Sequence, residues 1–300
     1  MNKIPYGRAI CYSGFRHGQS PILEVFPTYD EVKEDLLLLE KDFDYIRMYH
    51  PNQHAKTVLD VIRKENIQLQ VMLGMDLLGE LNNPNCAWGG DYTIEECAEN
   101  IRKNQEALFQ LINLANEYED IVWSVSAGNE SVPDWNENLV DPQRVLYFVR
   151  QLKAYVNQPV TYCDNFYYWG NKLTEVAEEV DFISIHTYPV WTGKRIAEAF
   201  DTSIEEYNSV KNLYPDKDVM ITEAGWPTTS NGSGINRYVA NEQHQLMYVN
   251  QMRKWSIKNK VKVYFFEAFD EPWKGSSDEH EPEKHWGFYT VHRQPKQIKR

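Results

Sequence analysis

Eight short apolar segments alternate with helical segments along the whole chain, and this alternation constrains the fold more than any other feature. The apolar segments are nearly continuous, as expected for parallel strands that are covered on both faces. We expect strands at residues 7–12, 43–49, 67–74, 121–127, 159–163, 180–187, 218–222 and 261–266. One α/β barrel needs ~250 residues, and the chain has 300. The chain is therefore predicted to form a single (β/α)8 TIM barrel, one domain over residues 1–300.

Helical periodicity follows the first seven of these strands. The predicted helices cover residues 29–41, 53–65, 93–118, 142–156, 171–178, 196–212 and 238–259. Thr28 is expected to cap the first helix, and Thr93 and Glu96 have the spacing of a capping box. About 30 residues of mostly loop composition follow the last strand, so the last barrel helix is predicted to be short or truncated.

An open doubly wound sheet is the alternative arrangement for alternating strands and helices. Such a sheet would carry a Gly-rich phosphate-binding turn after its first strand, and Ser13-Gly-Phe-Arg-His-Gly18 lacks that spacing. No linker, composition break or low-complexity run divides the chain. The barrel is therefore the favoured architecture.

Charge and composition exclude several classes of partner. The net charge of −13 argues against nucleic acid and anionic membranes, which attract clustered Lys and Arg. No apolar stretch approaches the ~20 residues of a membrane span. The first residues, Met1-Asn-Lys-Ile-Pro-Tyr6, lack the apolar segment of a signal peptide. We expect a cytosolic monomer, or an exported protein whose leader is not part of this chain.

The cysteine and histidine residues show no metal-binding spacing, so we predict neither a metal nor a cofactor. Cys11 and Cys163 lie in predicted strands and are expected to be buried thiols. Cys86 and Cys97 share one loop-to-helix region and could pair in an oxidising compartment. The sequence leaves this pairing open.

Two carboxylates stand where a barrel places its chemistry, at the C-terminal ends of strands. The fourth strand leads into Asn129-Glu130, and the seventh leads directly into Glu223. Glu130 and Glu223 are 93 residues apart, which corresponds to three barrel units of ~31 residues. Strands three apart face each other obliquely across the barrel mouth, so the two side chains are predicted to converge.

Two converging carboxylates, about 5–5.5 Å apart, are what a retaining glycosidase requires. One carboxyl is protonated and assists the leaving oxygen, while the other is ionised and attacks the anomeric carbon. Either residue alone has a structural explanation: Glu130 at the start of a helix or turn, and Glu223 as an ordinary acid at a strand end. Their occurrence together, beside Gly128 and Trp226, favours catalysis.

Further polar residues follow the sixth and eighth strands. Tyr188 is placed to donate its hydroxyl to Glu223, although packing against the following turn is the alternative. Lys274 lies among acids and large rings in the segments Glu267-Ala-Phe-Asp-Glu-Pro-Trp-Lys274 and Glu283-Lys-His-Trp-Gly287. These segments predict a network that binds sugar hydroxyl groups; a solvated loop of charges is the alternative.

Taken together, these motifs resemble glycoside hydrolase family 17, a family of β-1,3-glucanases in a clan of retaining barrels. The motifs are Asn129-Glu130, Thr222-Glu-Ala-Gly-Trp-Pro-Thr228, and the segments 266–274 and 283–287. The resemblance covers essentially the whole chain, from Ile10 to Phe288, and Glu-x-Gly-Trp-Pro is its most specific element.

The resemblance implies a role for each matching residue. Glu130 would be the acid/base and Glu223 the nucleophile of a double displacement. The subsite that holds the reacting sugar would be lined by Tyr12, Asn129, Asn165, Tyr188, Glu271, Lys274 and Glu283. Loop-borne rings that are candidates for the flanking subsites are Trp88, Trp135, Trp169, Trp191 and Trp273.

The chain also departs from the plant members of this family. His186 stands where plant members usually have Asn, and Asp270-Glu-Pro-Trp273 replaces their Asn-Glu pattern. The loops resemble a bacterial or fungal-like branch, which includes exo-acting and transglycosylating enzymes. Endo action on long chains is therefore left open.

Three functions remain as hypotheses, and a related retaining barrel that acts on another β-linkage is also left open. The first is a retaining hydrolase that acts on a laminarin-type β-1,3-glucan, and the second is a β-1,3-glucanosyltransferase that uses the same carboxylates. The third is a carbohydrate-binding protein without turnover. Retention of both Glu130 and Glu223 argues against the third, because a pure binder has no need of the pair. Branch tolerance and chain-length preference cannot be predicted from these residues.

Overall fold

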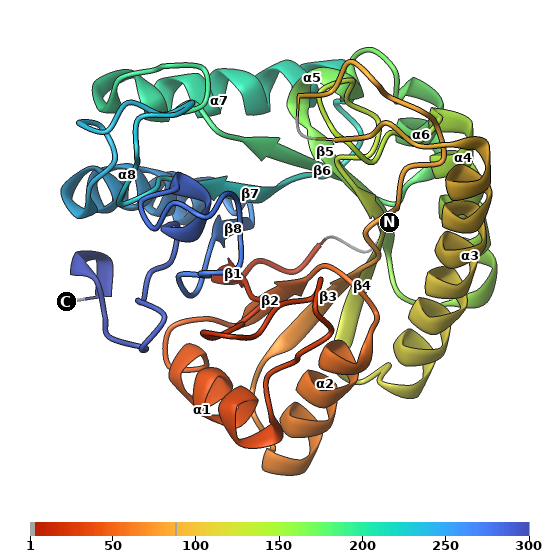
Figure 1. Cartoon of the computed structure of the whole chain (residues 1–300), viewed down its shortest axis with the longest axis horizontal. Coiled ribbons are helices and arrows are strands. Elements are labelled where there is room, and N and C mark those ends of the chain that lie inside the picture. The colour runs from red at the N-terminus through yellow and green to blue at the C-terminus, as the bar shows by residue number, and fades with distance from the viewer. Residues whose placement is uncertain (1–3, 88, 300) are drawn as a thin grey trace.

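The computed structural model describes residues 4–87 and 89–299, and its eight parallel strands close into one barrel (Figure 1). Each strand pairs with the next, and the last pairs with the first. The strands are β1 (Ala9–Cys11), β2 (Tyr45–Met48), β3 (Gln70–Gly74), β4 (Val122–Asn129), β5 (Val160–Asn165), β6 (Ile183–Thr187), β7 (Val219–Gly225) and β8 (Val263–Phe266). The predicted (β/α)8 barrel is confirmed.

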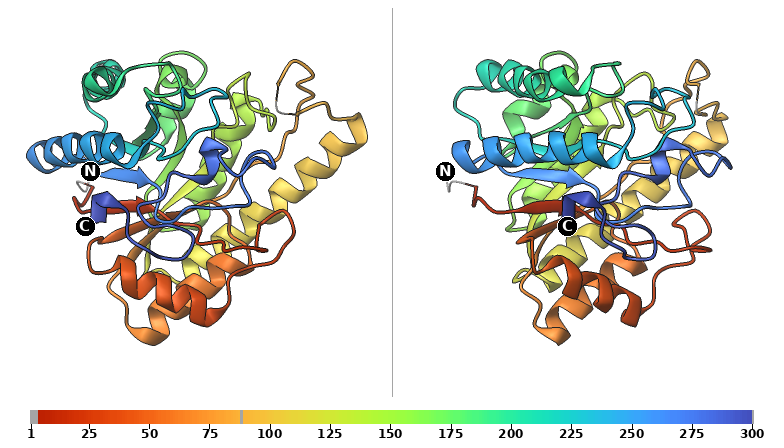
Figure 2. Two further views of the ribbon diagram at one scale, coloured as in Figure 1. Left: turned by 60° about the vertical axis from the view of Figure 1, so that its left-hand side comes forward. Right: turned by 90° about the vertical axis from the view of Figure 1, so that its left-hand side faces the viewer.

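Helices surround the barrel and bury their apolar faces against the outside of the strands (Figures 1 and 2). They are α1 (Tyr29–Leu39), α2 (Gln53–Glu65), α3 (Ile94–Glu117), α4 (Pro142–Tyr155), α5 (Phe166–Trp169), α6 (Thr174–Glu179), α7 (Ile196–Leu213) and α8 (Glu242–Asn259). The predicted caps are present: Thr28 caps α1, and Thr93 with Glu96 forms a capping box at α3. The short helix α5 was not predicted.

The segment after β8 takes the place of a regular last helix, as predicted. Its helical parts among the described residues are two short 3₁₀ turns, η1 (Pro282–Lys284) and η2 (Gln297–Lys299). Buried ion pairs hold this segment against the barrel. Arg293 donates to both carboxylate oxygens of Asp35 on α1, at 2.6 and 2.7 Å, and Lys296 lies 2.6 Å from Asp270. Ion pairs between side chains thus fix the segment after β8, in place of the apolar packing of a regular helix.

The interior of the barrel is filled by side chains rather than open. Cys11, Met72, Cys163, Met220 and Tyr264 belong to one buried cluster of residues from the strands. Cys11 and Cys163 are therefore buried, as expected, and all four cysteines are free thiols. Cys86 and Cys97 do not pair in this structure; the Cys86 thiol lies 3.1 Å from the carbonyl oxygen of Trp135.

Within residues 4–87 and 89–299, no helix combines the length and the apolar character that crossing a membrane requires. The same part of the chain contains no group of three or more His, Cys, Asp and Glu side chains that is arranged to hold a metal ion.

Candidate active site

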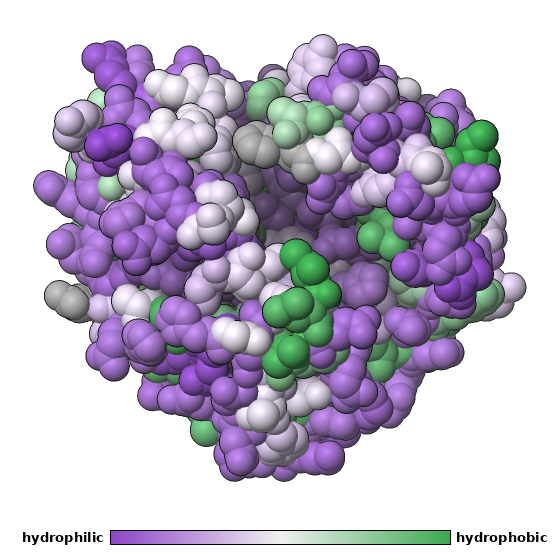
Figure 3. All heavy atoms as spheres, viewed as in Figure 1, coloured by the Kyte–Doolittle hydropathy of each residue, from purple (hydrophilic) through white to green (hydrophobic). Residues whose placement is uncertain are grey.

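All eight strands deliver a side chain to one cavity of about 1070 Å³ at the C-terminal end of the barrel. Figure 3 shows a hollow near the centre of this face. The cavity-lining residues at or just beyond the ends of β1 to β8 are, in that order, Tyr12, Tyr49, Asp76, Glu130, Asn165, Tyr188, Glu223 and Phe266. Because parallel strands all end on the same side, residues far apart in the chain meet here.

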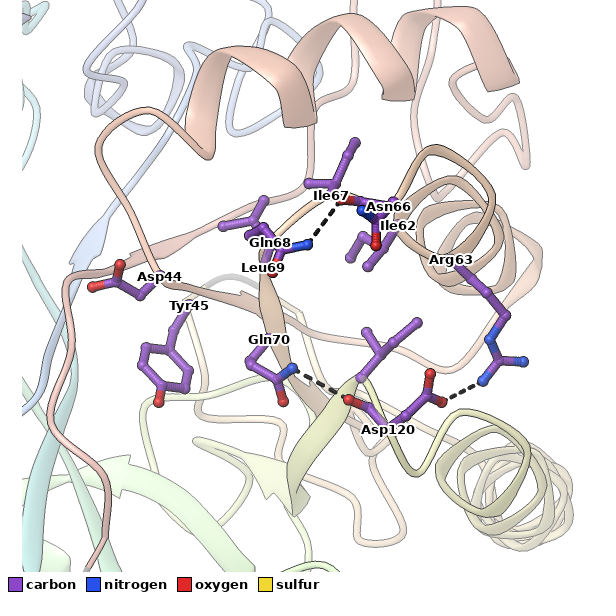
Figure 4. Close-up of a pocket in the computed structure, with 11 residues that line it drawn as sticks. Asp44, Tyr45, Ile62, Arg63, Asn66, Ile67, Gln68, Leu69, Gln70 and Asp120 are labelled. Carbon is purple, nitrogen blue, oxygen red and sulfur yellow. Dashed lines mark hydrogen bonds and ion pairs between the residues drawn. The ribbon is translucent and has the colours of Figure 1, made fainter.

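A smaller cavity of about 390 Å³ lies at the opposite end of the strands (Figure 4). Two of its polar side chains already bond to Asp120 in the cavity wall. Gln70 Nε2 donates to the carbonyl oxygen of Asp120 at 3.2 Å, and Arg63 pairs with the Asp120 carboxylate at 2.5 Å. The candidates for chemistry therefore belong to the larger cavity.

Glu130 and Glu223 converge, as predicted, and the imidazole of His186 lies between them. Nδ1 of His186 is 2.8 Å from Glu130 Oε1, and its Nε2 is 3.6 Å from Glu223 Oε1. Glu223 and His186 are buried, whereas the Glu130 side chain keeps 18% of its surface exposed. Both carboxylates line the cavity, and Glu130 is the more exposed of the two.

Three donors fix the carboxylate of Glu223. Tyr188 donates its hydroxyl to Oε2 at 2.5 Å, which confirms the predicted contact. Tyr49 and Arg47 both donate to Oε1, at 3.0 and 2.5 Å. Burial alone would raise the pKa of Glu223, but the His186 and Arg47 cations outweigh burial and lower that pKa to about 2. Glu223 is therefore ionised at neutral pH.

Arg47 is a site residue that was not predicted from the sequence. Its guanidinium is buried, and it links β4 to β7 by donating to Asn129 Oδ1 as well as to Glu223, each at 2.5 Å. An unpaired buried guanidinium is strongly unfavourable, so a lone Arg inside an apolar strand is a signal for such a partner. Arg47 is such a residue, because it stands in the otherwise largely apolar segment at the end of β2.

The turn after β4 projects Glu130 out of the barrel wall. Gly128 has φ 156° and Glu130 has φ 45°, so the chain leaves the extended conformation here. A Cβ atom on Gly128 would lie only 2.8 Å from the Tyr162 ring, so this position requires glycine. Asn136 holds the turn by donating to the Glu130 carbonyl oxygen at 2.6 Å.

The predicted polar network after β8 is present. Lys274 Nζ lies 2.6 Å from Glu267 and 2.8 Å from Glu271, and Lys274 and Glu283 both line the cavity. Burial raises the pKa of Glu283 to about 7. The prediction for Glu271 was wrong in one respect: it lies behind Lys274, fully buried, and accepts a hydrogen bond from the backbone of Phe15 at 3.2 Å. It anchors the network instead of lining the cavity.

Two further predicted residues, Tyr12 and Asn165, line the cavity. The ring of Tyr12 contributes to the wall, but its hydroxyl is 3.2 Å from Asp35 and so is not available to a sugar. Asn165 caps α5 by accepting from the backbone of Tyr167 at 3.1 Å.

The five tryptophan candidates have different outcomes. Trp135, Trp191 and Trp273 line the cavity. Trp169 was predicted wrongly, because it lies on α5, is fully buried and donates from Nε1 to the carbonyl oxygen of Ser184 at 2.9 Å. Trp88 lies outside the described residues.

Replacing His186 is expected to change how stability depends on pH. Burial disfavours the imidazolium, yet Glu223 and Glu130 outweigh it and raise the pKa of His186 from 6.5 to about 10. The charged pairing therefore stabilises the fold fully below pH 6.5, and this contribution is lost as the pH rises through 10. Urea denaturation between pH 5.5 and 10 should show His186→Asn less stable than the wild type, on the order of a few kcal/mol at low pH.

That difference should shrink steadily between pH 6.5 and 10. The exposed His280, changed to Asn, is the matched control and should follow the wild type throughout. A constant difference between His186→Asn and the wild type would contradict the charged pairing.

Residues 9–287 match the BtgE/BtgC glycoside hydrolase domain. The chain belongs to this family of glycoside hydrolases. The resemblance to glycoside hydrolase family 17 is thereby confirmed.

Curated relatives of this glycoside hydrolase are named for β-1,3-glucans. A glucan 1,3-beta-glucosidase of Arthroderma benhamiae is 27% identical over 194 residues, 59% of this chain and 61% of the relative. A putative glucan endo-1,3-beta-glucosidase of Aspergillus niger is 23% identical over 272 residues, 84% of this chain and 37% of the relative. The chain spans about half the length of the curated relatives it matches.

Solved structures of the same fold include two enzymes of β-1,3-glucan chemistry. An endo-laminarinase from Formosa Hel1_33_131 superposes with a TM-score of 0.81 at 26% identity, covering 97% of this chain and 85% of that one. A β-1,3-glucanosyltransferase from Rhizomucor miehei superposes with a TM-score of 0.74 at 21% identity, covering 97% and 95%. The second likeness shows the fold alone.

Proposed function

We propose that this glycoside hydrolase cleaves β-1,3-glucosidic bonds in laminarin-type glucans with retention of anomeric configuration. The observation that carries this proposal is the convergence of Glu130 and Glu223 on one imidazole at the base of the cavity. The two carboxylates differ in environment, as an acid and a nucleophile must. The names of the relatives support β-1,3-glucan as the substrate.

In this proposal Glu223 is the nucleophile and Glu130 the acid/base. In its protonated form Glu130 gives a proton to the glycosidic oxygen while the Glu223 carboxylate attacks the anomeric carbon, which forms a covalent glucosyl-enzyme and releases the leaving sugar. Glu130 then removes a proton from a water molecule that attacks the same carbon, and Glu223 departs. The arginine, histidine and tyrosines around Glu223 keep it ionised and aimed.

The remaining polar groups of the cavity would bind the sugar that reacts. Asn129 accepts from Arg47 through Oδ1, and its Nδ2 makes no hydrogen bond to another described residue, so it can donate to a sugar hydroxyl. Lys274 and Glu283 line the same cavity near Trp273. We assign Trp135 and Trp191, which are 45% and 38% exposed, to stacking on flanking sugar units. Residues 1–300 would form one catalytic domain.

Transfer to a sugar acceptor is the second candidate. It uses the same glucosyl-enzyme, and the partly exposed rings of Trp135 and Trp191 would favour a sugar acceptor over water. A binding protein without turnover is disfavoured, because the geometry keeps Glu223 ionised and leaves Glu130 accessible.

A time course on a linear β-1,3-gluco-oligosaccharide series tests the proposal. Hydrolysis should give only products shorter than the substrate, with newly formed reducing ends first appearing as the β-anomer in proton NMR. Products longer than the substrate would establish transfer. The absence of any cleavage of β-1,3-oligosaccharides, with intact fold by circular dichroism, would contradict both.

A further inference from the structure

Asp76 is an acidic residue of the active-site cavity that has no hydrogen-bond or ion-pair partner among the described residues. It follows β3 by two residues and lines the cavity. Its Oδ1 is buried, and neither carboxylate oxygen forms a hydrogen bond or an ion pair with another described residue. Buried polar groups in folded proteins are almost always paired, so an exception calls for an explanation. A ligand that completes the pairing is one such explanation.

The barrel order places Asp76 opposite the nucleophile. β3 and β7 are four strands apart around the eight-stranded barrel, so Asp76 and Glu223 belong to opposite walls of the cavity. A sugar whose anomeric carbon is attacked by Glu223 must lie between these walls. The neighbouring strand β4 carries Glu130, which must reach the glycosidic oxygen. Asp76 therefore faces the sugar close to the bond that breaks.

The electrostatic surroundings favour a neutral carboxyl group at this position. Burial raises the pKa of Asp76 to about 7, against the opposing effect of the Arg47 cation. The negative charges of Glu223 and Glu130 raise it further. Burying an oxygen of a neutral carboxyl group costs less free energy than burying an oxygen of a carboxylate. The hydroxyl of the neutral form can also donate a hydrogen bond as well as accept one.

We propose that Asp76 is a substrate-binding residue that hydrogen-bonds a ring hydroxyl group of the glucan next to the scissile bond. This inference rests on the proposed function, since it needs a sugar between Glu223 and Glu130. Secondary hydroxyl groups flank the bridging oxygen of a 1,3-linked glucan, so a group that both donates and accepts suits this position. Asp76 would thus contribute to the choice of substrate without taking part in bond cleavage.

Two substitutions at this position separate binding from structure. Asp76→Ala removes the hydrogen bond, and Asp76→Asn keeps a donor and an acceptor of the same shape. We expect Asp76→Ala to lower kcat/KM on laminaripentaose by about 10- to 100-fold, mainly through a higher KM. A decrease of this size corresponds to the loss of one hydrogen bond to the substrate. Asp76→Asn should recover most of this loss, and the Tm of both variants should stay close to that of the wild type.

Asp120→Asn is the matched control, because Asp120 lies in the small cavity at the other end of the barrel and should leave kcat/KM unchanged. Two results would overturn the assignment of Asp76. One is wild-type kinetics in Asp76→Ala. The other is an equal loss of kcat/KM in Asp76→Ala and Asp76→Asn, accompanied by a lower Tm in both variants. A wild-type enzyme that cleaves no β-1,3-glucan would instead contradict the proposed function, so the two failures are distinguishable.

Discussion

Glu223→Gln should abolish cleavage of linear β-1,3-glucans, with a loss in kcat of about four orders of magnitude. An amide cannot attack the anomeric carbon, so the covalent step has no nucleophile. The amide fills the same volume and its oxygen can still accept from Tyr188, Tyr49 or Arg47, so the barrel should remain folded. Reducing-sugar release from laminarin measures the activity, and circular dichroism checks the fold.

Glu179→Gln is the control for this experiment, because Glu179 forms an exposed ion pair with Arg150 on the outside of the barrel. Its activity should equal that of the wild type. A smaller side chain gives a second test of the role. In Glu223→Ala, azide should enter in place of the carboxylate and convert an activated β-glucosyl substrate into the α-glucosyl azide. Normal turnover in Glu223→Gln would remove the nucleophile assignment.

The sequence located both carboxylates because one geometric rule maps chain position onto space. In a parallel barrel every strand ends at the same face, so an acid directly after a strand enters the cavity wherever it lies in the chain. The location of Glu130 and Glu223 in the cavity could be predicted from the spacing of the strands alone. The location of Tyr188 could be predicted from its position directly after β6. These predictions depended on strand order and not on side-chain detail.

The contacts that tune the site could not be predicted in this way. Arg47 meets a carboxylate 176 positions away. The position of His186 between Glu130 and Glu223 also depends on how β4, β6 and β7 are registered. Periodicity along one segment carries no information about contacts across a closed barrel. The same limit applies to Asp76, whose Oδ1 is buried without a hydrogen-bond partner among the described residues.

The errors have a local cause. Trp169 was predicted to be a loop-borne ring of a flanking subsite, but it lies on the four-residue helix α5 and its ring is buried in the core. A helix of one turn is too short to leave a periodic pattern. Glu271 was assigned to the sugar site from its motif alone, whereas Lys274 stands between it and the cavity. In both cases the predicted segment lies near the cavity, but the side chain itself does not line the cavity.

Loss of Glu130 should affect the two chemical steps differently, depending on the leaving group. Glu130→Gly is the most suitable variant, because φ at this position is 45° and glycine adopts that conformation without strain. Cleavage of laminarin should fall by roughly 10³-fold, since a sugar is a poor leaving group without a proton donor. An aryl glucoside with an acidic phenol needs no such proton, so its first step should proceed at nearly the wild-type rate.

The second step with that aryl substrate should then limit turnover, because water has lost its general base. A burst of phenol followed by a slow steady state is the expected stopped-flow signal, with the glucosyl-enzyme detectable by mass spectrometry. Azide should restore the steady-state rate and give the β-glucosyl azide, the opposite anomer to that expected from Glu223→Ala. The two azide products thus assign each carboxylate separately. An α-azide from Glu130→Gly, or equal losses on laminarin and the aryl substrate, would show that Glu130 is not the acid/base.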